Sequence, residues 1–171
     1  MDQPSQVNAM NWIANESMKK LLRQCGDGQL NIPSVKVSAL RKLLFPPFRA
    51  VRDCVILSEM PAEELDAAFD RAMEICFDKT EYEACNTETR IDCFFEEALS
   101  REQGFEIALL ALKTWAIQLK YMQPEARFCM ILACDDDHTE IRFHKLREGE
   151  SRWLCDDINQ YPDGAIGYFI L

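Results

Sequence analysis

The sequence predicts an α+β protein in which a helical N-terminal two-thirds is packed on a small, mainly antiparallel C-terminal sheet. Apolar residues return every three or four positions over most of residues 1–122, which is the period of an amphipathic helix. Beyond that point the pattern changes to apolar runs of strand length and to strict alternation, which are typical of β-strands. Only 6 glycines in 171 residues also favour helices over a turn-rich β-sandwich.

We expect a single domain over residues 1–171. A chain of roughly 150 residues buries about 70% of its unfolded surface, which is enough for a core of its own. No internal repeat or low-complexity linker divides the sequence. The helical part is residues 1–122, and residues 126–171 hold a β-hairpin, a short helix and a final strand.

Three helices are expected before residue 58. The first runs from about Ser5 to Gln24 and ends at Gly26-Asp27-Gly28. The second begins at the N-cap Ser34 and ends at Pro46-Pro47. The third is marked by apolar residues at helical spacing, namely Phe48, Val51, Val55 and Ile56.

The middle of the chain predicts two acidic helices around a polar loop. Pro61 suits a first helical position, and the acidic run after it complements the helix dipole. Residues 78–89 are predicted to be a loop, and a further helix runs from about Thr89 to Ser100. The first of these helices has an apolar stripe of Leu65, Phe69, Met73 and Cys76 or Phe77. In the second helix, the side chains expected to face the core are those of Phe94, Phe95, Ala98 and Leu99.

The clearest periodicity predicts a helix from roughly Arg101 to Met122 that forms the spine of the core. The run FCMILAC and the alternating TEIRFHK then predict a hairpin of 127–134 with 139–146. A helical turn follows in SRWLCDDINQYP, and AIGYFIL closes the chain as an apolar strand. An exposed edge strand of that composition would aggregate, so we expect it inside the sheet or covered by helices.

The cysteines and the N-terminus favour a cytoplasmic protein. No stretch has 18 uninterrupted apolar residues, and the N-terminus lacks the basic-then-apolar order of a secretory signal. A chain of this length needs no disulfides for stability. We expect its 8 cysteines to be free and mostly buried as small hydrophobic residues.

Charge is distributed unevenly along the chain. Residues 1–57 hold 8 basic and 4 acidic residues, residues 58–107 hold 4 and 15, and residues 108–171 hold 7 and 10. The net negative charge of residues 58–107 creates a field that repels nucleic acid and anionic lipid and speeds the encounter with a basic protein. An ordinary solvated helix face is the alternative interpretation. The candidate partner-binding acids of this region are Glu63, Glu64, Asp66, Asp70, Glu74, Glu96 and Glu97.

No motif predicts a reaction. The glycines match neither phosphate-binding pattern, and no run of acids has the spacing of a calcium loop. Cys134, His138 and His144 are weak candidates for metal ligands, because a tight turn and opposite strand faces can separate them. A thiol enzyme would need Cys129 or Cys134 beside His144, but an apolar environment makes a thiol inert. We therefore expect no catalytic residue, metal or cofactor.

The segment GESRWLCDDINQYPDG contains Trp153 and Tyr161 on either side of Asp156 and Asp157. These residues either seat a short helix on the sheet or, with the aromatic rings as anchors, bind a basic partner. The arrangement of a hairpin, R-x-G-E-S-x-W-L-x-D-D-I-x-x-Y and an apolar last strand resembles the ends of some bacterial immunity proteins. The resemblance covers about 40 of the 171 residues. It implies a small, acidic, cytosolic, non-catalytic inhibitor of a toxin that is commonly a basic nuclease, whereas the basic N-terminal third departs from that family.

Three functions follow as hypotheses. The first is a stoichiometric inhibitor of a basic protein, such as an immunity protein that neutralises a toxin, with no direct binding to nucleic acid or membrane. It would use the acids of residues 58–107 together with Trp153, Asp156 and Asp157. The second is a small metal-dependent or thiol enzyme centred on Cys134, His138 and His144. The third is a regulatory or scaffold subunit of a larger complex.

Overall fold

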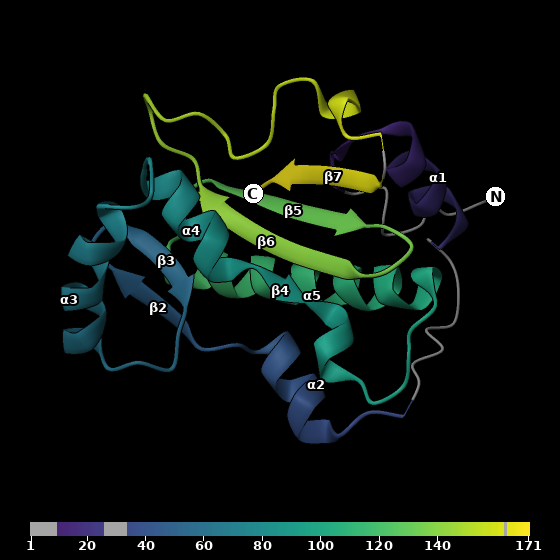
Figure 1. Ribbon diagram of the computed structural model, residues 1–171, viewed down its shortest axis with the longest axis horizontal. Coiled ribbons are helices and arrows are strands. Elements are labelled where there is room, and N and C mark those ends of the chain that lie inside the picture. The colour runs from purple at the N-terminus through teal and green to yellow at the C-terminus, as the bar shows by residue number, and fades with distance from the viewer. Residues whose placement is uncertain (1–9, 26–33, 163) are drawn as a thin grey trace.

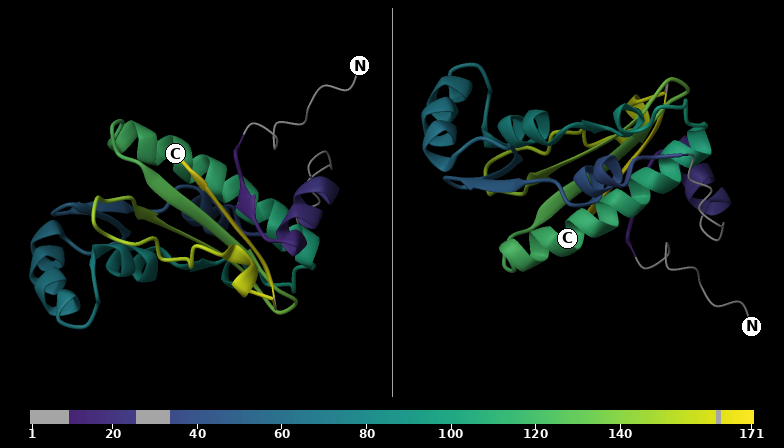
Figure 2. Two further views of the ribbon diagram at one scale, coloured as in Figure 1. Left: turned by 90° about the horizontal axis from the view of Figure 1, so that it is seen from above. Right: turned by 90° about the horizontal axis from the view of Figure 1, so that it is seen from below.

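The computed structural model describes residues 10–25, 34–162 and 164–171. Within these ranges the main sheet has five antiparallel strands in the order β1-β7-β5-β6-β4. Helix α5 (Arg101–Met122) runs along one face of the sheet, and the segment 146–162 crosses the other face (Figures 1 and 2). The protein is therefore an α+β protein with its sheet mainly in the C-terminal part, as the sequence predicts.

The expected hairpin and final strand are confirmed. β5 (Phe128–Cys134) pairs with β6 (Thr139–Lys145) along their whole lengths. β7 (Ala165–Ile170) lies between β5 and the short edge strand β1 (Ile13–Ala14), so it is an inner strand. β4 (Thr89–Arg90) forms the opposite edge beside β6.

Alternation along β5 divides the core between the two faces of the sheet. Phe128, Met130 and Leu132 belong to the large cluster that includes α5, whereas Cys129 and Ile131 pack with the segment 146–162. The bounds expected for α5 are confirmed. Ser100 and Gln103 form a capping box at its start, which is a local signal that sequence alone carries.

The first helix begins later than expected. Helix α1 (Glu16–Gln24) starts after Asn15, whose side chain accepts a hydrogen bond from the Met18 amide. The same side chain donates to the Gly164 carbonyl oxygen at 2.7 Å, so Asn15 also ties the helix to the chain before β7. The predicted start at about Ser5 and the stop at residues 26–28 lie outside the described residues.

Two further expectations for the N-terminal third are wrong. Helix α2 (Val37–Leu44) begins after Lys36 rather than at Ser34. The segment expected to be a third helix is a hairpin of β2 (Phe48–Val51) and β3 (Cys54–Leu57). Arg52 in its turn has a φ of 51°. Gly or Asn, which usually occupy such a position, would have indicated a turn in the sequence, whereas Arg does not.

The middle third also differs from the expectation. Helix α3 (Ala62–Met73) follows Pro61 as predicted, but residues 78–89 are not a loop, because α4 (Lys79–Thr87) occupies most of them. The helix expected over 89–100 is instead β4, a 3₁₀ turn (η2, Ile91–Phe94) and irregular chain. Pairing of β4 with β6 takes this segment out of the helical conformation.

Residues 151–162 contain the short 3₁₀ helix η3 (Ile158–Gln160), which agrees with the expected helical turn. All eight cysteines are free, as expected, but three are buried (Cys54, Cys129 and Cys134) and three are exposed (Cys85, Cys93 and Cys155). Across the described ranges, none of the helices has the length and apolar character needed to cross a membrane.

Candidate functional site

Helix α3 forms one end of the molecule and packs on the β2–β3 hairpin through Leu65 and Phe69 (Figure 1). Its outward surface carries the acids that the sequence analysis singled out. Glu63, Glu64 and Glu74 are exposed, and none of them forms an ion pair within the described part of the chain. Their charge is therefore available to a partner.

The other two acids of α3 have an internal partner. Asp66 and Asp70 bind the guanidinium of Arg52 at 2.9 and 2.8 Å. Arg52 also lies over the ring of Phe69, with its Cζ 4.9 Å from the ring centroid. The hydrogen bond from Arg52 lowers the pKa of Asp66, so this carboxylate stays ionised. Arg52 reduces the charge that these two acids offer to a partner.

Two large apolar side chains stand in solvent just after α3. Ile75 is 88% exposed and Phe77 is 93% exposed. Of the two residues expected to end the apolar stripe of α3, Cys76 packs against the cluster of Leu65 and Phe69, whereas Phe77 does not, because the helix ends at Met73 and the chain turns before α4 begins. Exposed aromatic and aliphatic side chains beside unpaired charges are typical of an interface whose apolar centre is surrounded by a polar rim.

A groove of about 360 Å³ separates the start of α4 from the segment after β6. It brings together two regions that the sequence analysis considered separately, the acidic middle third and the aromatic C-terminal segment. The residues that line it are Phe77, Asp78, Thr80, Glu81, Gly149, Ser151, Arg152 and Trp153.

Helix α4 forms one wall of the groove, and carboxylates cap its first turn. The side chain of Asp78 accepts a hydrogen bond from the Glu81 amide at 2.8 Å. One carboxylate oxygen of Glu150 accepts from both the amide and the hydroxyl of Thr80, at 3.1 and 2.8 Å. These bonds satisfy amide donors of the first turn of α4 and fix residue 150 beside the helix.

The contacts of Trp153 with Arg142 and His144 fix the opposite wall of the groove. The guanidinium of Arg142 lies 4.1 Å from the centroid of the Trp153 ring. The Trp153 amide donates to Nε2 of His144 at 3.4 Å, while Nδ1 of His144 lies 3.2 Å from the Lys145 carbonyl oxygen. Burial lowers the pKa of His144, so the imidazole is neutral, with Nδ1 as donor and Nε2 as acceptor.

A buried ion pair fixes the frame of the groove. Glu83 is fully buried and accepts hydrogen bonds from the amides of Val55 and Lys145, at 2.7 and 2.6 Å. It also binds Arg147 at 2.9 Å. Since these residues belong to α4, β3, β6 and the chain after β6, one carboxylate connects all the elements around the groove.

The remaining acids of the sequence prediction lie apart from α3 or are already engaged. Glu96 and Glu97 follow η2, and Glu96 pairs with Lys36, next to α2, at 2.6 Å. Asp156 binds Arg152 at 2.7 Å, and Asp157 accepts from the Asn159 amide. The structure thus brings Trp153 beside the acidic region, but it does not gather all the candidate acids on one surface.

The candidate metal and thiol residues do not converge. Cys134 faces α5 and accepts a hydrogen bond from the Thr139 hydroxyl at 3.2 Å, whereas His144 lies at the other end of the hairpin, opposite Cys129. His138 contacts Asp135 in the turn. No group of three or more His, Cys, Asp or Glu side chains in the described ranges could hold a metal ion.

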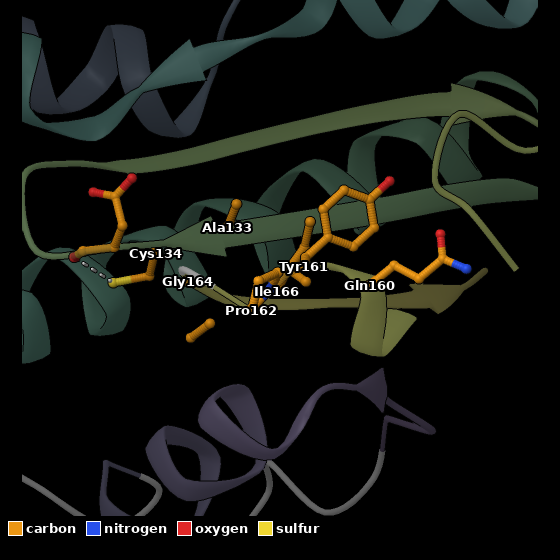
Figure 3. A pocket seen from close by; sticks show the side chains of 9 residues that line it. Ala133, Cys134, Gln160, Tyr161, Pro162, Gly164 and Ile166 are labelled. Atoms are coloured by element: carbon orange, nitrogen blue, oxygen red, sulfur yellow. Dashed lines mark hydrogen bonds between the residues drawn. The ribbon is translucent and has the colours of Figure 1, made fainter. Parts of the chain in front are cut away.

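A second cavity, of about 350 Å³, lies where β5 ends and β7 begins. Figure 3 shows Cys134 near one end of it and Gln160 near the other. Burial raises the pKa of the Cys134 thiol, so this thiol is protonated at neutral pH. The burial of Cys129, opposite His144, raises its pKa to about 12, so neither thiol is activated as a nucleophile.

Comparison with known proteins gives one match. A family model described as the uncharacterized protein PM0498 family matches residues 13–169, which include β1 and nearly all of β7. No curated protein and no solved structure matches the chain. The match covers the sheet, the helices and the groove, so the chain belongs to the uncharacterized protein PM0498 family.

Proposed function

We propose that this protein is a non-catalytic acidic binding protein that inhibits a basic protein partner, specifically an immunity protein that neutralises a toxin such as a nuclease. One observation carries the proposal. Helix α3 and its C-cap carry the unpaired carboxylates of Glu63, Glu64 and Glu74, and exposed Ile75 and Phe77 follow directly after the helix at the same end of the molecule.

The physical argument has two parts. The unpaired carboxylates attract a basic partner over a distance and raise the rate of association. Phe77 and Ile75 then lose their exposed apolar surface in the complex, which slows dissociation. An acidic surface alone would give a fast but weak and salt-sensitive encounter, so the apolar side chains are essential to the proposal.

The groove lined by Phe77 also supports the proposal that a partner binds at this surface. Its far wall is formed by Gly149, Ser151, Arg152 and Trp153, which lie in the segment that resembles immunity proteins. A partner that covers Phe77 also reaches this wall, because both line one groove. Steric occlusion of the partner's active site requires no reacting group on this chain, which is consistent with the protonated thiols of Cys129 and Cys134.

The experiment is a comparative affinity purification. Tagged wild-type protein and the variant Glu63→Lys/Glu64→Lys/Phe77→Asp are incubated with equal portions of lysate from the native cells, and bound polypeptides are quantified by mass spectrometry. We expect the wild type to retain one basic polypeptide near a 1:1 ratio and the variant to lose it. The recovered polypeptide is then assayed for nuclease and other toxic activities, which added wild-type protein should abolish.

The control is Glu96→Lys/Glu97→Lys, which reverses two acids outside the α3 surface. This variant should retain the polypeptide. The proposal is contradicted if the recovered partner keeps full activity in the complex, or if the triple variant binds the same polypeptides in the same amounts. A partner whose activity rises on binding would instead indicate a regulatory subunit.

A further inference from the structure

We propose that the groove between Phe77 and Trp153 is a binding site for an arginine side chain. The inference deepens the proposed function, on which it rests for the identity of the partner that supplies the arginine. The class of ligand follows from the walls of the groove, which combine two aromatic rings with carboxylates that lack a cationic partner. A planar guanidinium stacks on aromatic rings and binds carboxylates in a bidentate manner.

The two rings remain available to a ligand. Trp153 is 37% exposed and Phe77 is 93% exposed, and both line the groove. The guanidinium of Arg142, whose side chain is only 6% exposed, lies over one face of the Trp153 ring. Arg142 is neutralised by Glu140 and Glu88, at 2.6 and 3.0 Å. A second cation on the exposed part of the ring therefore meets little repulsion.

The uncompensated charge in the groove is negative. Asp78 and Glu81 accept hydrogen bonds from the amides of Glu81 and Phe77, which are uncharged donors. Neither carboxylate forms an ion pair in the part of the chain that the structure describes. The cation that lines the groove, Arg152, is bound to Asp156 at 2.7 Å and to the Tyr168 hydroxyl at 2.6 Å.

An anionic ligand is disfavoured by the same geometry. A helix N-terminus binds anions through free amide groups, but the first-turn amides of Thr80 and Glu81 already donate to the carboxylates of Glu150 and Asp78. An incoming anion would meet those carboxylates instead of amide hydrogens. A cation meets carboxylate oxygens that still have lone pairs to accept from it.

The test uses a small probe and needs no partner. The full chain is labelled with ¹⁵N and titrated with N-acetyl-arginine amide, and the three tryptophan indole signals are followed by NMR. We expect a saturable shift of the Trp153 indole in the millimolar range. The Trp115 indole should not move, because it is buried and donates to the Leu43 carbonyl oxygen. The matched control probe is N-acetyl-citrulline amide, which has nearly the same shape but no charge.

Single substitutions then locate the site. Phe77→Ala and Glu81→Gln should each weaken arginine binding by about fivefold, the range of an exposed cation–π contact or a charge-assisted hydrogen bond. In Glu81→Gln the side-chain amide oxygen can still accept from the Phe77 amide, so the turn is preserved. Glu97→Gln removes an acid outside the groove and should change nothing. Equal shifts with the citrulline probe, no shift of Trp153, or an equal loss in Glu97→Gln would overturn the inference.

Failure of this inference differs from failure of the proposed function. If arginine amide leaves Trp153 unmoved while a basic partner is lost on charge reversal at Glu63 and Glu64, the groove assignment is wrong and the inhibitor function stands. If the probe binds as expected but no basic partner is retained, the groove assignment stands and the inhibitor function is wrong.

Discussion

Glu83 forms an ion pair with Arg147, with 2.9 Å between Oε2 and Nη1, although the Glu83 side chain is fully buried. The same carboxylate accepts from two backbone amides, those of Val55 and Lys145. Removal of the Glu83 charge leaves the two amide donors without their acceptor and takes from Arg147 its buried partner, although its ion pairs with Asp53 and Glu150 stay. The bond between Glu83 and Arg147 therefore determines whether α4, and with it the groove, keeps its position.

Glu83→Gln should lower the free energy of unfolding by about 3 kcal/mol, the usual cost of breaking a buried ion pair. Urea denaturation of the two proteins at neutral pH measures this difference. The matched control is Glu96→Gln, because Glu96 and Lys36 are both about three-quarters exposed. A surface pair of this kind contributes at most about 1 kcal/mol. If the two variants lost the same stability, the buried network would not be what holds the groove in place.

Gly167 in β7 tests the contact between the sheet and the N-terminal elements. A Cβ at this position would lie 2.9 Å from Met18 Cγ, 3.1 Å from Ala14 Cβ and 3.2 Å from Trp12 Cε3. Gly167→Ala should therefore destabilise the protein by about 1–3 kcal/mol through overpacking. Gly164→Ala is the control, since its Cβ would meet nothing closer than 3.6 Å. Thermal unfolding of both variants measures the loss of stability. If Gly167→Ala left the stability unchanged, α1 and β1 would have to adjust freely to the added methyl group.

The position of Trp153 should depend on pH through His144. Burial lowers the pKa of His144 below its usual 6.5, so the unfolded chain takes up a proton at higher pH than the folded chain does. The resulting stabilisation is complete above about pH 6.5 and is lost as the pH falls below it. The free energy of unfolding should decline between pH 7.5 and pH 5, and the Trp153 amide loses its acceptor only at the lower pH at which folded His144 itself takes up a proton.

The control for this titration is His144→Gln, whose side-chain oxygen accepts from the Trp153 amide without titrating. Its free energy of unfolding should change less between pH 7.5 and pH 5 than that of the wild type. Asp53 does not interfere, because the hydrogen bond from Lys145 lowers its pKa to about 2 and its contribution is lost only below about pH 4. Identical pH profiles for the wild type and His144→Gln would exclude His144 as the titrating group.

The sequence correctly predicts the elements whose structure depends on residues that are close together in the chain. The uninterrupted apolar period predicts α5, and the change of period at residue 127 predicts β5 and β6. The β2–β3 hairpin is not predicted because the apolar residues 48, 51, 55 and 56 have helical spacing instead of strand alternation, while Arg52 gives no turn signal.

Helix α4 is not predicted because most of its buried residues are polar, with Tyr82 and Ala84 as the buried apolar ones. Thr80, Glu83 and Thr87 face inward, and their partners are Glu150, Arg147 and the Phe143 carbonyl oxygen, all more than 50 residues away in the sequence. A hydrophobic period cannot reveal such a helix, since long-range hydrogen bonds take the place of apolar contacts.

The candidate site was predictable only in its parts. The acids of α3 are exposed as their spacing indicated, and Trp153 borders the groove. The exposure of Phe77 was not predictable, because it depends on where α3 ends. The meeting of residues 77–81 with 149–153 is a contact between distant segments, which no local pattern encodes.

The most direct test of the account is the association rate constant of this protein with its basic partner as a function of salt concentration. It is measured by stopped flow for the wild type, for Glu63→Lys/Glu64→Lys and for Glu96→Lys/Glu97→Lys. If the α3 surface steers binding, the first variant should associate about tenfold more slowly at low salt and with a shallower salt dependence, whereas the second should resemble the wild type. Equal rates for all three proteins at low salt would contradict the proposal that the acidic surface of α3 docks the partner.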